Sequence, residues 1–132
     1  MGQQSERLER LITDREGECC TVDVDARIET LEHHVTNLPS DIARDQAALK
    51  TLSNDTRYTI IRLLAATERE LCVCEITPVV DVSDSAVSHA LSDLYDADLV
   101  TRRKDGTWRY YEATERATAL LDALDRTREE FR

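Results

Sequence analysis

The stretch from residue 70 to residue 112 constrains the fold of this 132-residue chain more than any other part of the sequence. It predicts two short helices, over residues 74–80 and 84–95, which are joined by a tight turn at 80–82. Two extended segments follow, 99–104 and 107–112, on either side of Asp105-Gly106, a dipeptide typical of two-residue hairpin loops. The segment is therefore expected to form a helix-turn-helix unit followed by a β-hairpin.

The helix predicted over 84–95 has two contrasting faces. Val87, Leu91 and Leu94 recur at i, i+4 and i+7, which is the spacing of a buried helical face. The other face carries short hydrogen-bonding side chains, which allow a helix to lie deep in the major groove and contact base edges. The predicted DNA contacts on this helix, including the serine that caps it, are Ser83, Ser85, Ser88, His89 and Ser92.

Positive charge is concentrated on the predicted hairpin, although the whole chain has a formal net charge of −10. A DNA-binding surface needs cations that neutralise phosphates, so the overall charge argues against this function at first sight. However, Lys50 and Lys104 are the only lysines, and this arginine-rich, acidic composition resembles that of proteins from salt-loving organisms. The local charge favours a hairpin that grips the phosphates of double-stranded DNA through Arg102, Arg103, Lys104 and Arg109.

The rest of the chain is predicted to be helical. Helices are expected over 1–16, from Val24 onward, over 42–52, after the capping residues 53–55, and from Glu115, with Pro39 as a break. The predicted fold is mainly α with a small β-hairpin. Its parts are an N-terminal helical arm with a cysteine pair (1–40), a DNA-binding domain (41–114) and a C-terminal dimerisation helix (115–132).

The cysteines are expected to be ligands or redox groups. The N-terminal residues lack an apolar signal-peptide core and no segment is long enough to span a membrane, so we expect a cytoplasmic protein with reduced thiols. In a regular helix, Cys72 and Cys74 would be turned from each other by about 200°. A shared ion therefore needs an extended or unwound backbone there, or the very start of a helix, and we expect ion binding to compete with helix formation.

Thiol chemistry indicates which ions these cysteines would bind. Soft thiolates select ions such as arsenite, antimonite, cadmium, lead and copper(I). Because trivalent arsenic takes three sulfurs, Cys19 and Cys20 are predicted to complete the site of Cys72 and Cys74, with four sulfurs suiting cadmium or lead. The alternative is a regulator whose thiols respond to oxidants or reactive sulfur. Neither a constitutive cofactor nor an enzyme activity is predicted, because the three glycines are isolated and no nucleophile–base spacing is present.

Residues 48–112 resemble the ArsR/SmtB family of metal-responsive winged-helix repressors. The resemblance rests on the strings ALKTLSNDTRYTIIRLLA (48–65), ELCVCEI (70–76), VSDSAVSHALSDLYDADLV (82–100) and RRKDGTWRYYEAT (102–114). It implies a winged helix-turn-helix homodimer formed by the N-terminal and C-terminal helices. It also implies that this repressor binds its operator and releases it when arsenic(III), antimony(III), cadmium(II) or lead(II) binds ELCVCEI.

The sequence departs from the family pattern in several places. Thr77 stands where the arsenic-responsive type often has a third cysteine, and Pro78 is expected to weaken the short helix or delay its start. Asp81 and Asp98 replace glycines at two helix ends, where aspartate tolerates the left-handed conformation better than most residues. The C-terminal helix contains no histidine, which argues against a zinc, nickel or cobalt sensor.

Overall fold

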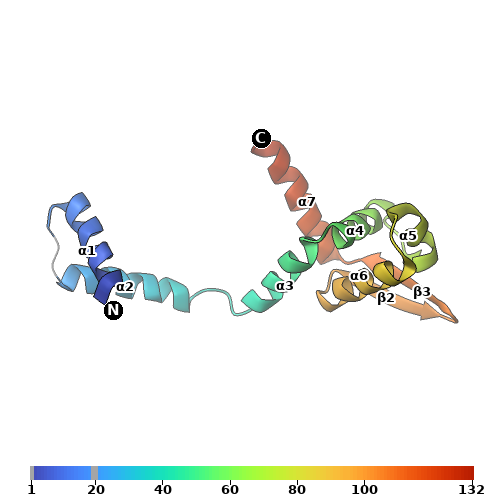
Figure 1. The fold of residues 1–132 in the computed structure, drawn as a ribbon, viewed down its shortest axis with the longest axis horizontal. Helices are drawn as coiled ribbons and strands as arrows, with labels where there is room; N and C mark the ends of the chain where they lie inside the picture. The colour runs from blue at the N-terminus through green and yellow to red at the C-terminus, as the bar shows by residue number, and fades with distance from the viewer. Residues whose placement is uncertain (1, 19–20) are drawn as a thin grey trace. The chain divides into compact units, whose positions relative to one another are not determined.

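The computed structural model describes residues 2–18 and 21–132. The chain divides into two compact units, Met1–Ile42 and Ala43–Arg132. The first unit contains two helices, α1 (Gly2–Glu16) and α2 (Thr21–Thr36) (Figure 1). Ile12 of α1 and Val24 of α2 are buried where these helices pack together. Cys19 and Cys20, predicted as ligands, lie outside the described residues.

The remaining elements follow the predicted order. They are α3 (Ile42–Leu52), α4 (Asp55–Thr67), β1 (Leu71–Cys72), α5 (Val73–Val80), α6 (Asp84–Asp96), β2 (Val100–Asp105), β3 (Trp108–Ala113) and α7 (Glu115–Glu130). The helix starts have local causes, because the side chains of Asn54, Ser83 and Thr114 each accept a backbone N–H from the first turn of α4, α6 and α7. The helices predicted from the sequence are confirmed.

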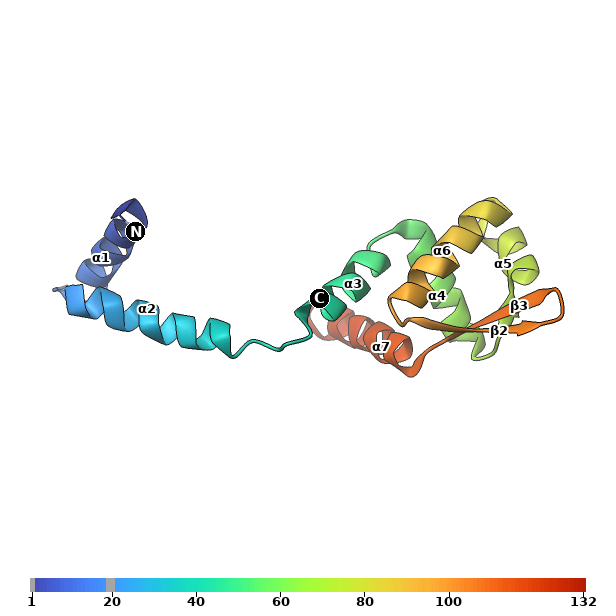
Figure 2. The same ribbon diagram turned by 90° about the horizontal axis from the view of Figure 1, so that it is seen from below.

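One hydrophobic core joins the helices of the second unit. Its largest fully buried side chains include Ile60, Ile61 and Leu64 of α4 and, as predicted, Val87, Leu91 and Leu94 of α6. Arg62 of α4 donates two hydrogen bonds to Asp125 of α7, at 2.7 and 2.9 Å, which ties α7 to this body. The β2–β3 hairpin projects from the helices, at the end of the unit opposite to α7 (Figures 1 and 2).

The sheet differs from the predicted hairpin in two respects. It contains a third strand, since β1 pairs with β3 to give the antiparallel order β1-β3-β2. The loop is also shifted by one residue from Asp105-Gly106, because Asp105 pairs with Trp108 and leaves Gly106 and Thr107 as the turn. Gly106 has a φ of +64°, which fits a type II′ loop with glycine at its first position. The register in which β2 and β3 pair, rather than the dipeptide alone, sets the position of the loop.

The turns at the ends of α5 and α6 have the expected backbone. Asp81 and Asp98 are both left-handed, with φ of +55° and +61°, as predicted from the aspartates at these positions. Pro78 does not delay the start of α5, which begins at Val73 and contains this proline in its interior. The N-cap residue Cys72 sets the start of α5. Pro78 only removes one backbone N–H from the second turn of this helix. Within residues 2–18 and 21–132, no helix is long and apolar enough to cross a lipid bilayer.

Candidate metal centre and DNA interface

The thiols of Cys72 and Cys74 meet at the start of α5. Their Sγ atoms lie 2.7 Å apart. Two sulfurs bonded at about 2.3 Å to one tetrahedral ion would lie roughly 3.8 Å apart, so the two thiols need to separate only slightly to share an ion. The contact arises because Cys72 is the extended N-cap of α5, with ψ of 155°, so the helical rotation between the two positions does not apply. A shared ion was expected to need an extended or unwound backbone, or the very start of a helix. The structure shows the last of these, because Cys72 is the N-cap of α5. The helix does not have to unwind for the sulfurs to approach each other.

A capping box holds Cys72 in this position. Its Sγ accepts the backbone N–H of Cys74 at 3.2 Å, while Oε1 of Glu75 accepts the backbone N–H of Cys72 at 3.0 Å. The pattern corresponds to S/T-x-x-E with cysteine in the first position. The role of Glu75 was not predicted, although the spacing Cys72-x-x-Glu75 could have revealed it.

The two thiols differ in environment. Cys72 is buried and Cys74 is exposed. The hydrogen bond with Cys72 raises the pKa of the Cys74 thiol above its ordinary value, and partial desolvation adds to the rise. Across the part of the chain that the structure describes, no group of three or more His, Cys, Asp or Glu side chains could hold a metal ion. The described site therefore supplies two sulfurs.

The thiol pair is connected directly to the hairpin. Cys72 belongs to β1 and is paired with Tyr110 of β3. One residue before this strand, Glu70 accepts a hydrogen bond from Arg103 of β2 at 2.9 Å, and this contact raises the pKa of the Arg103 guanidinium. A displacement of Cys72 would therefore act on the hairpin through both the strand pairing and the ion pair.

The polar face predicted on α6 is open to solvent. Ser85, Ser88, His89 and Ser92 are all exposed on this helix. Ser83 is also exposed, and its hydroxyl accepts the N–H of Ala86 at 3.1 Å as the helix cap. The short side chains leave a helix surface with little bulk, which suits insertion into a major groove.

The four cations predicted on the hairpin come together in space. Arg102, Arg103, Lys104 and Arg109 line one pocket of about 260 Å³. Two of them also stack on tyrosines, since the Arg102 guanidinium lies 3.9 Å from the ring centre of Tyr95 and that of Arg103 lies 4.8 Å from Tyr110. These contacts orient the guanidinium groups, which can donate hydrogen bonds to phosphate oxygens.

A short helix, a left-handed turn, an exposed polar helix and a basic hairpin together define a winged helix-turn-helix DNA-binding protein. The comparisons with known proteins agree. The chain belongs to the arsR family: "Bacterial regulatory protein, arsR family" matches residues 54–102, and a relative matches nearly the whole chain. The protein is therefore an ArsR-type transcriptional repressor and not an enzyme, as predicted.

That relative is the "Putative arsenical resistance operon repressor ArsR" of Halobacterium salinarum. It is 49% identical over 126 residues, which cover 94% of this chain and 97% of the relative. A second protein of the same organism, "Putative arsenical resistance operon repressor ArsR2", is 52% identical over 67% of this chain and 76% of its own length.

Solved structures share the fold. HlyU from Vibrio cholerae matches with a TM-score of 0.60 and 28% identity, over 67% of this chain and 96% of that one. The homodimeric winged helix-turn-helix domain Mb0332 from Mycobacterium bovis matches with a TM-score of 0.57 and 28% identity, over 67% of this chain and 81% of that one. The winged helix-turn-helix fold predicted from the sequence is confirmed.

Proposed function

We propose that this repressor binds operator DNA as a homodimer in the cytoplasm and releases it when a thiophilic ion binds its cysteines. Arsenite and antimonite are the expected inducers, with cadmium and lead as further candidates. The observation that carries the proposal is the 2.7 Å contact between the Cys72 and Cys74 sulfurs at the start of the helix-turn-helix unit. The relatives named as arsenical resistance operon repressors support the choice of ion.

In the DNA complex, α6 would lie in the major groove and the hairpin along the adjacent backbone. The exposed serines and His89 of α6 would contact base edges. The cations that line the hairpin pocket, Arg102, Arg103, Lys104 and Arg109, would contact phosphates. These residues form the DNA-binding surface of the proposal.

The ion would act on this surface through β1. Cys72 both caps α5 and pairs with Tyr110. An ion bonded to both sulfurs would therefore reposition the start of α5 and the strand of the hairpin at once. The proposed consequence is that α6 and the hairpin lose the relative placement that the operator requires.

A bare trivalent ion needs more sulfur than the described site holds. We assign the third sulfur, and a fourth for cadmium or lead, to Cys19 and Cys20 of the same or the partner subunit. Their thiols are the chain's remaining soft donors. The N-terminal segment 1–40 would then serve as the arm that completes the site.

Exposed apolar side chains on α3, on α7 and directly after α7 support the homodimer. Leu49 is 65% exposed, Leu124 is 43% exposed and Phe131 is 80% exposed. The exposure of Leu124 leaves it available for contact with a second copy. The homodimeric Mb0332 domain supports the same assembly. The C-terminal segment 115–132 is thus proposed to form part of the interface.

The test is a titration of the protein–DNA complex with each ion under strict reduction. The DNA is a fragment selected for binding from a random-sequence library, and the measured quantity is the fraction bound. We expect arsenite to release the parent protein, whereas Cys72→Ser and Cys74→Ser bind DNA normally and remain bound. The Cys19→Ser/Cys20→Ser variant should need at least about tenfold more arsenite. Full release of both single variants would overturn the sensing role and leave the repressor role standing.

A redox-responsive repressor is the second candidate. The direct contact between the two sulfurs favours it, because thiols that touch are placed for oxidation to a disulfide. The two candidates separate cleanly in the absence of oxidant. Release of DNA by a stoichiometric ion under strict reduction supports the ion sensor, whereas release only by oxidants, reversed by a reductant, supports the redox sensor.

A further inference from the structure

Helix α2 and the turn after it carry an apolar stripe that the first unit leaves largely uncovered. The stripe begins at Val24, and its other members follow at alternating steps of four and three residues: Ile28, Leu31, Val35 and Leu38. Val24 is buried and Ile28 is half-buried, whereas Leu31, Val35 and Leu38 are 53%, 66% and 54% exposed. These last four residues form the open stripe. Contiguous exposed apolar surface of this kind marks an interaction site.

The spacing of the open stripe is that of a heptad repeat. In a coiled coil, apolar residues recur at the a and d positions of each heptad, at steps of three and four. Ile28 and Val35 then occupy a, while Leu31 and Leu38 occupy d. β-Branched residues at a with leucine at d favour two parallel strands over larger assemblies. The stripe therefore fits a second copy of the same helix.

The charges beside the stripe fit the parallel orientation. Arg27 occupies a g position and Glu32 the next e position, and these positions face each other across a parallel two-stranded coil. Two-fold symmetry provides this pair of opposite charges twice. An antiparallel pair would bring e positions together, and the acidic side chains of Asp25 and Glu32 would then repel each other. The charges thus select both the partner and its direction.

Both members of this charge pair are accessible in the structure. Glu32 is exposed. Arg27 donates a hydrogen bond to Glu16 of α1 at 3.2 Å, in an ion pair whose side chains are 43% and 56% exposed. Exposed ion pairs of this kind contribute little to stability, so Arg27 can exchange Glu16 for a partner on a second copy at little cost.

The pairing needs a second connection between the two copies. Helix α2 has 16 residues, and isolated helices of this length are marginal in water. A homodimer joined through α3 and α7 would hold two copies of α2 on one molecule. Their pairing would then be an intramolecular step that benefits from a high effective concentration.

We propose that, in the ion-free repressor, the open stripe of α2 pairs in parallel with the open stripe of a second copy. Arg27 of each copy pairs with Glu32 of the other. This coiled coil gives the dimer a second interface, which lies outside residues 54–102, the part of the chain that matches the family. The inference rests on the proposed homodimer and adds an interaction surface to it.

The first experiment tests which positions face each other. The four native cysteines are replaced by serine in the full chain, and one cysteine is introduced by Leu31→Cys, by Val35→Cys or, as a control off the stripe, by His33→Cys. The rate of disulfide-linked dimer formation with diamide is measured. We expect Leu31→Cys and Val35→Cys to react at least about tenfold faster than His33→Cys, because the stripe holds like positions together. Fast reaction of Leu31→Cys alone would indicate an antiparallel pair and overturn the inference, as would equal rates in all three.

The second experiment measures the dissociation constant of the dimer by sedimentation. Leu31→Asp/Val35→Asp should raise it at least about tenfold, while the matched control Thr30→Asp/His33→Asp, off the stripe, should stay within about twofold of the parent. Arg27→Glu and Glu32→Arg should each weaken the dimer by about fivefold, and the combined variant should recover most of the loss. An unchanged constant in Leu31→Asp/Val35→Asp, or no recovery in the combined variant, would overturn the inference.

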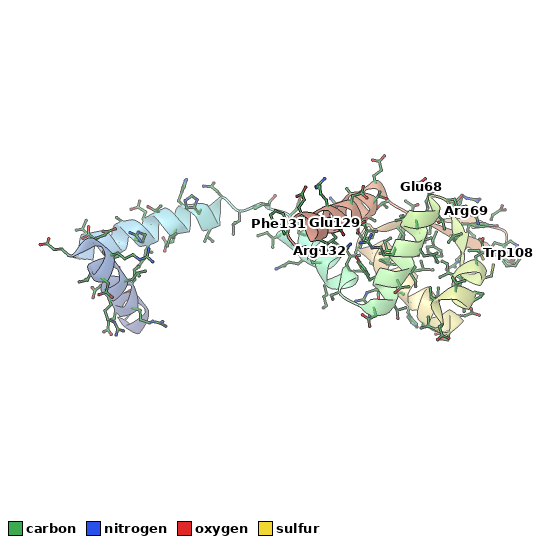
Figure 3. All side chains as sticks on the ribbon, turned by 90° about the horizontal axis from the view of Figure 1, so that it is seen from above. Glu68, Arg69, Trp108, Glu129, Phe131 and Arg132 are labelled. Atoms are coloured by element: carbon green, nitrogen blue, oxygen red, sulfur yellow. The ribbon has the colours of Figure 1, made fainter. Side chains whose placement is uncertain are left out.

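These outcomes differ from a failure of the proposed homodimer. Phe131→Asp reports on the interface of the second unit, since Figure 3 shows Phe131 at the end of that unit opposite to Trp108 of the hairpin. If the parent is dimeric and Phe131→Asp leaves its dissociation constant unchanged, the interface proposed around α7 fails. If Phe131→Asp weakens the dimer but Leu31→Asp/Val35→Asp does not, only the pairing of α2 fails.

Discussion

The two helices of the helix-turn-helix unit begin with the same kind of cap but with different atoms. At the start of α5, the sulfur of Cys72 accepts the N–H of Cys74 at 3.2 Å. At the start of α6, the hydroxyl of Ser83 accepts the N–H of Ala86 at 3.1 Å. Each cap satisfies a backbone donor that a helix leaves without a partner in its first turn. Serine is among the residues preferred at this position, whereas cysteine is not.

The difference shows how a structural position can become a sensor. A serine hydroxyl caps a helix but has little affinity for soft ions, so α6 keeps its start whatever ions are present. A cysteine sulfur caps the helix and also bonds such an ion. The proposed sensing group would thereby be built into α5, while the helix that would contact bases retains an inert cap.

The sharpest test of this comparison is Cys72→Ser. The substitution gives α5 the same cap as α6, so the free energy of unfolding should stay equal or rise by a few tenths of a kcal/mol. The cadmium concentration that releases DNA should rise more than about 100-fold, because one of the two adjacent sulfurs is gone. Urea unfolding and DNA release measure the two effects. The matched control, Ser83→Cys, should leave the cadmium response unchanged, and a normal response in Cys72→Ser would break the comparison.

The next effect is the pH dependence of cadmium binding. The raised pKa of Cys74 means that this thiol keeps its proton to higher pH, so protons compete with cadmium more strongly at lower pH. Affinity should therefore rise with pH, by up to about tenfold per pH unit for each proton displaced. Calorimetry across neutral pH measures the slope, which should be shallower in Cys74→Ser. Phenylarsine oxide is the control ligand. Each cysteine proton that it displaces leaves in a water molecule, so its affinity should depend much less on pH. A flat cadmium profile in the parent would contradict the expectation.

A smaller effect is expected from removing each cap. Ser83→Ala and Cys72→Ala should each lower the free energy of unfolding by about 1 kcal/mol, because each leaves a backbone N–H of a first turn without its side-chain acceptor. Urea unfolding of both variants measures the loss. Ser83→Ala should retain the full ion response. If Cys72→Ala cost nothing, the sulfur would not be acting as a cap.

The smallest effect on stability is expected at Glu75. This residue completes the capping box of α5, and α6 has no counterpart of it. Glu75→Ala should cost about 0.5 kcal/mol of stability, because the N–H of Cys72 loses its acceptor. Glu75→Gln keeps an amide oxygen at this position and should lose less. Thermal unfolding of both variants measures the difference. A loss in Glu75→Gln as large as in Glu75→Ala would argue that the charge of Glu75, not its hydrogen bond, matters.

Much of this arrangement was predictable because it depends on neighbours in the sequence. The buried face of α6 follows from the spacing of Val87, Leu91 and Leu94, and the start of this helix follows from Ser83. The left-handed turns at Asp81 and Asp98 were likewise predictable from residue type. Such features are decided within one or two helical turns, where periodicity and capping chemistry act directly.

The chain's own sequence thus determined the helices, their caps, the basic hairpin and the chemical softness of its thiols. Only the tertiary structure decided that Leu71–Cys72 is a strand, because its partners Tyr111 and Tyr110 are far away in the sequence. The same folding put Trp108 beside the thiols and moved the hairpin loop to Gly106 and Thr107. No local pattern records that β1 will pair with β3, a strand distant from it in the sequence. The loop position follows instead from the register in which the neighbouring strands β2 and β3 pair.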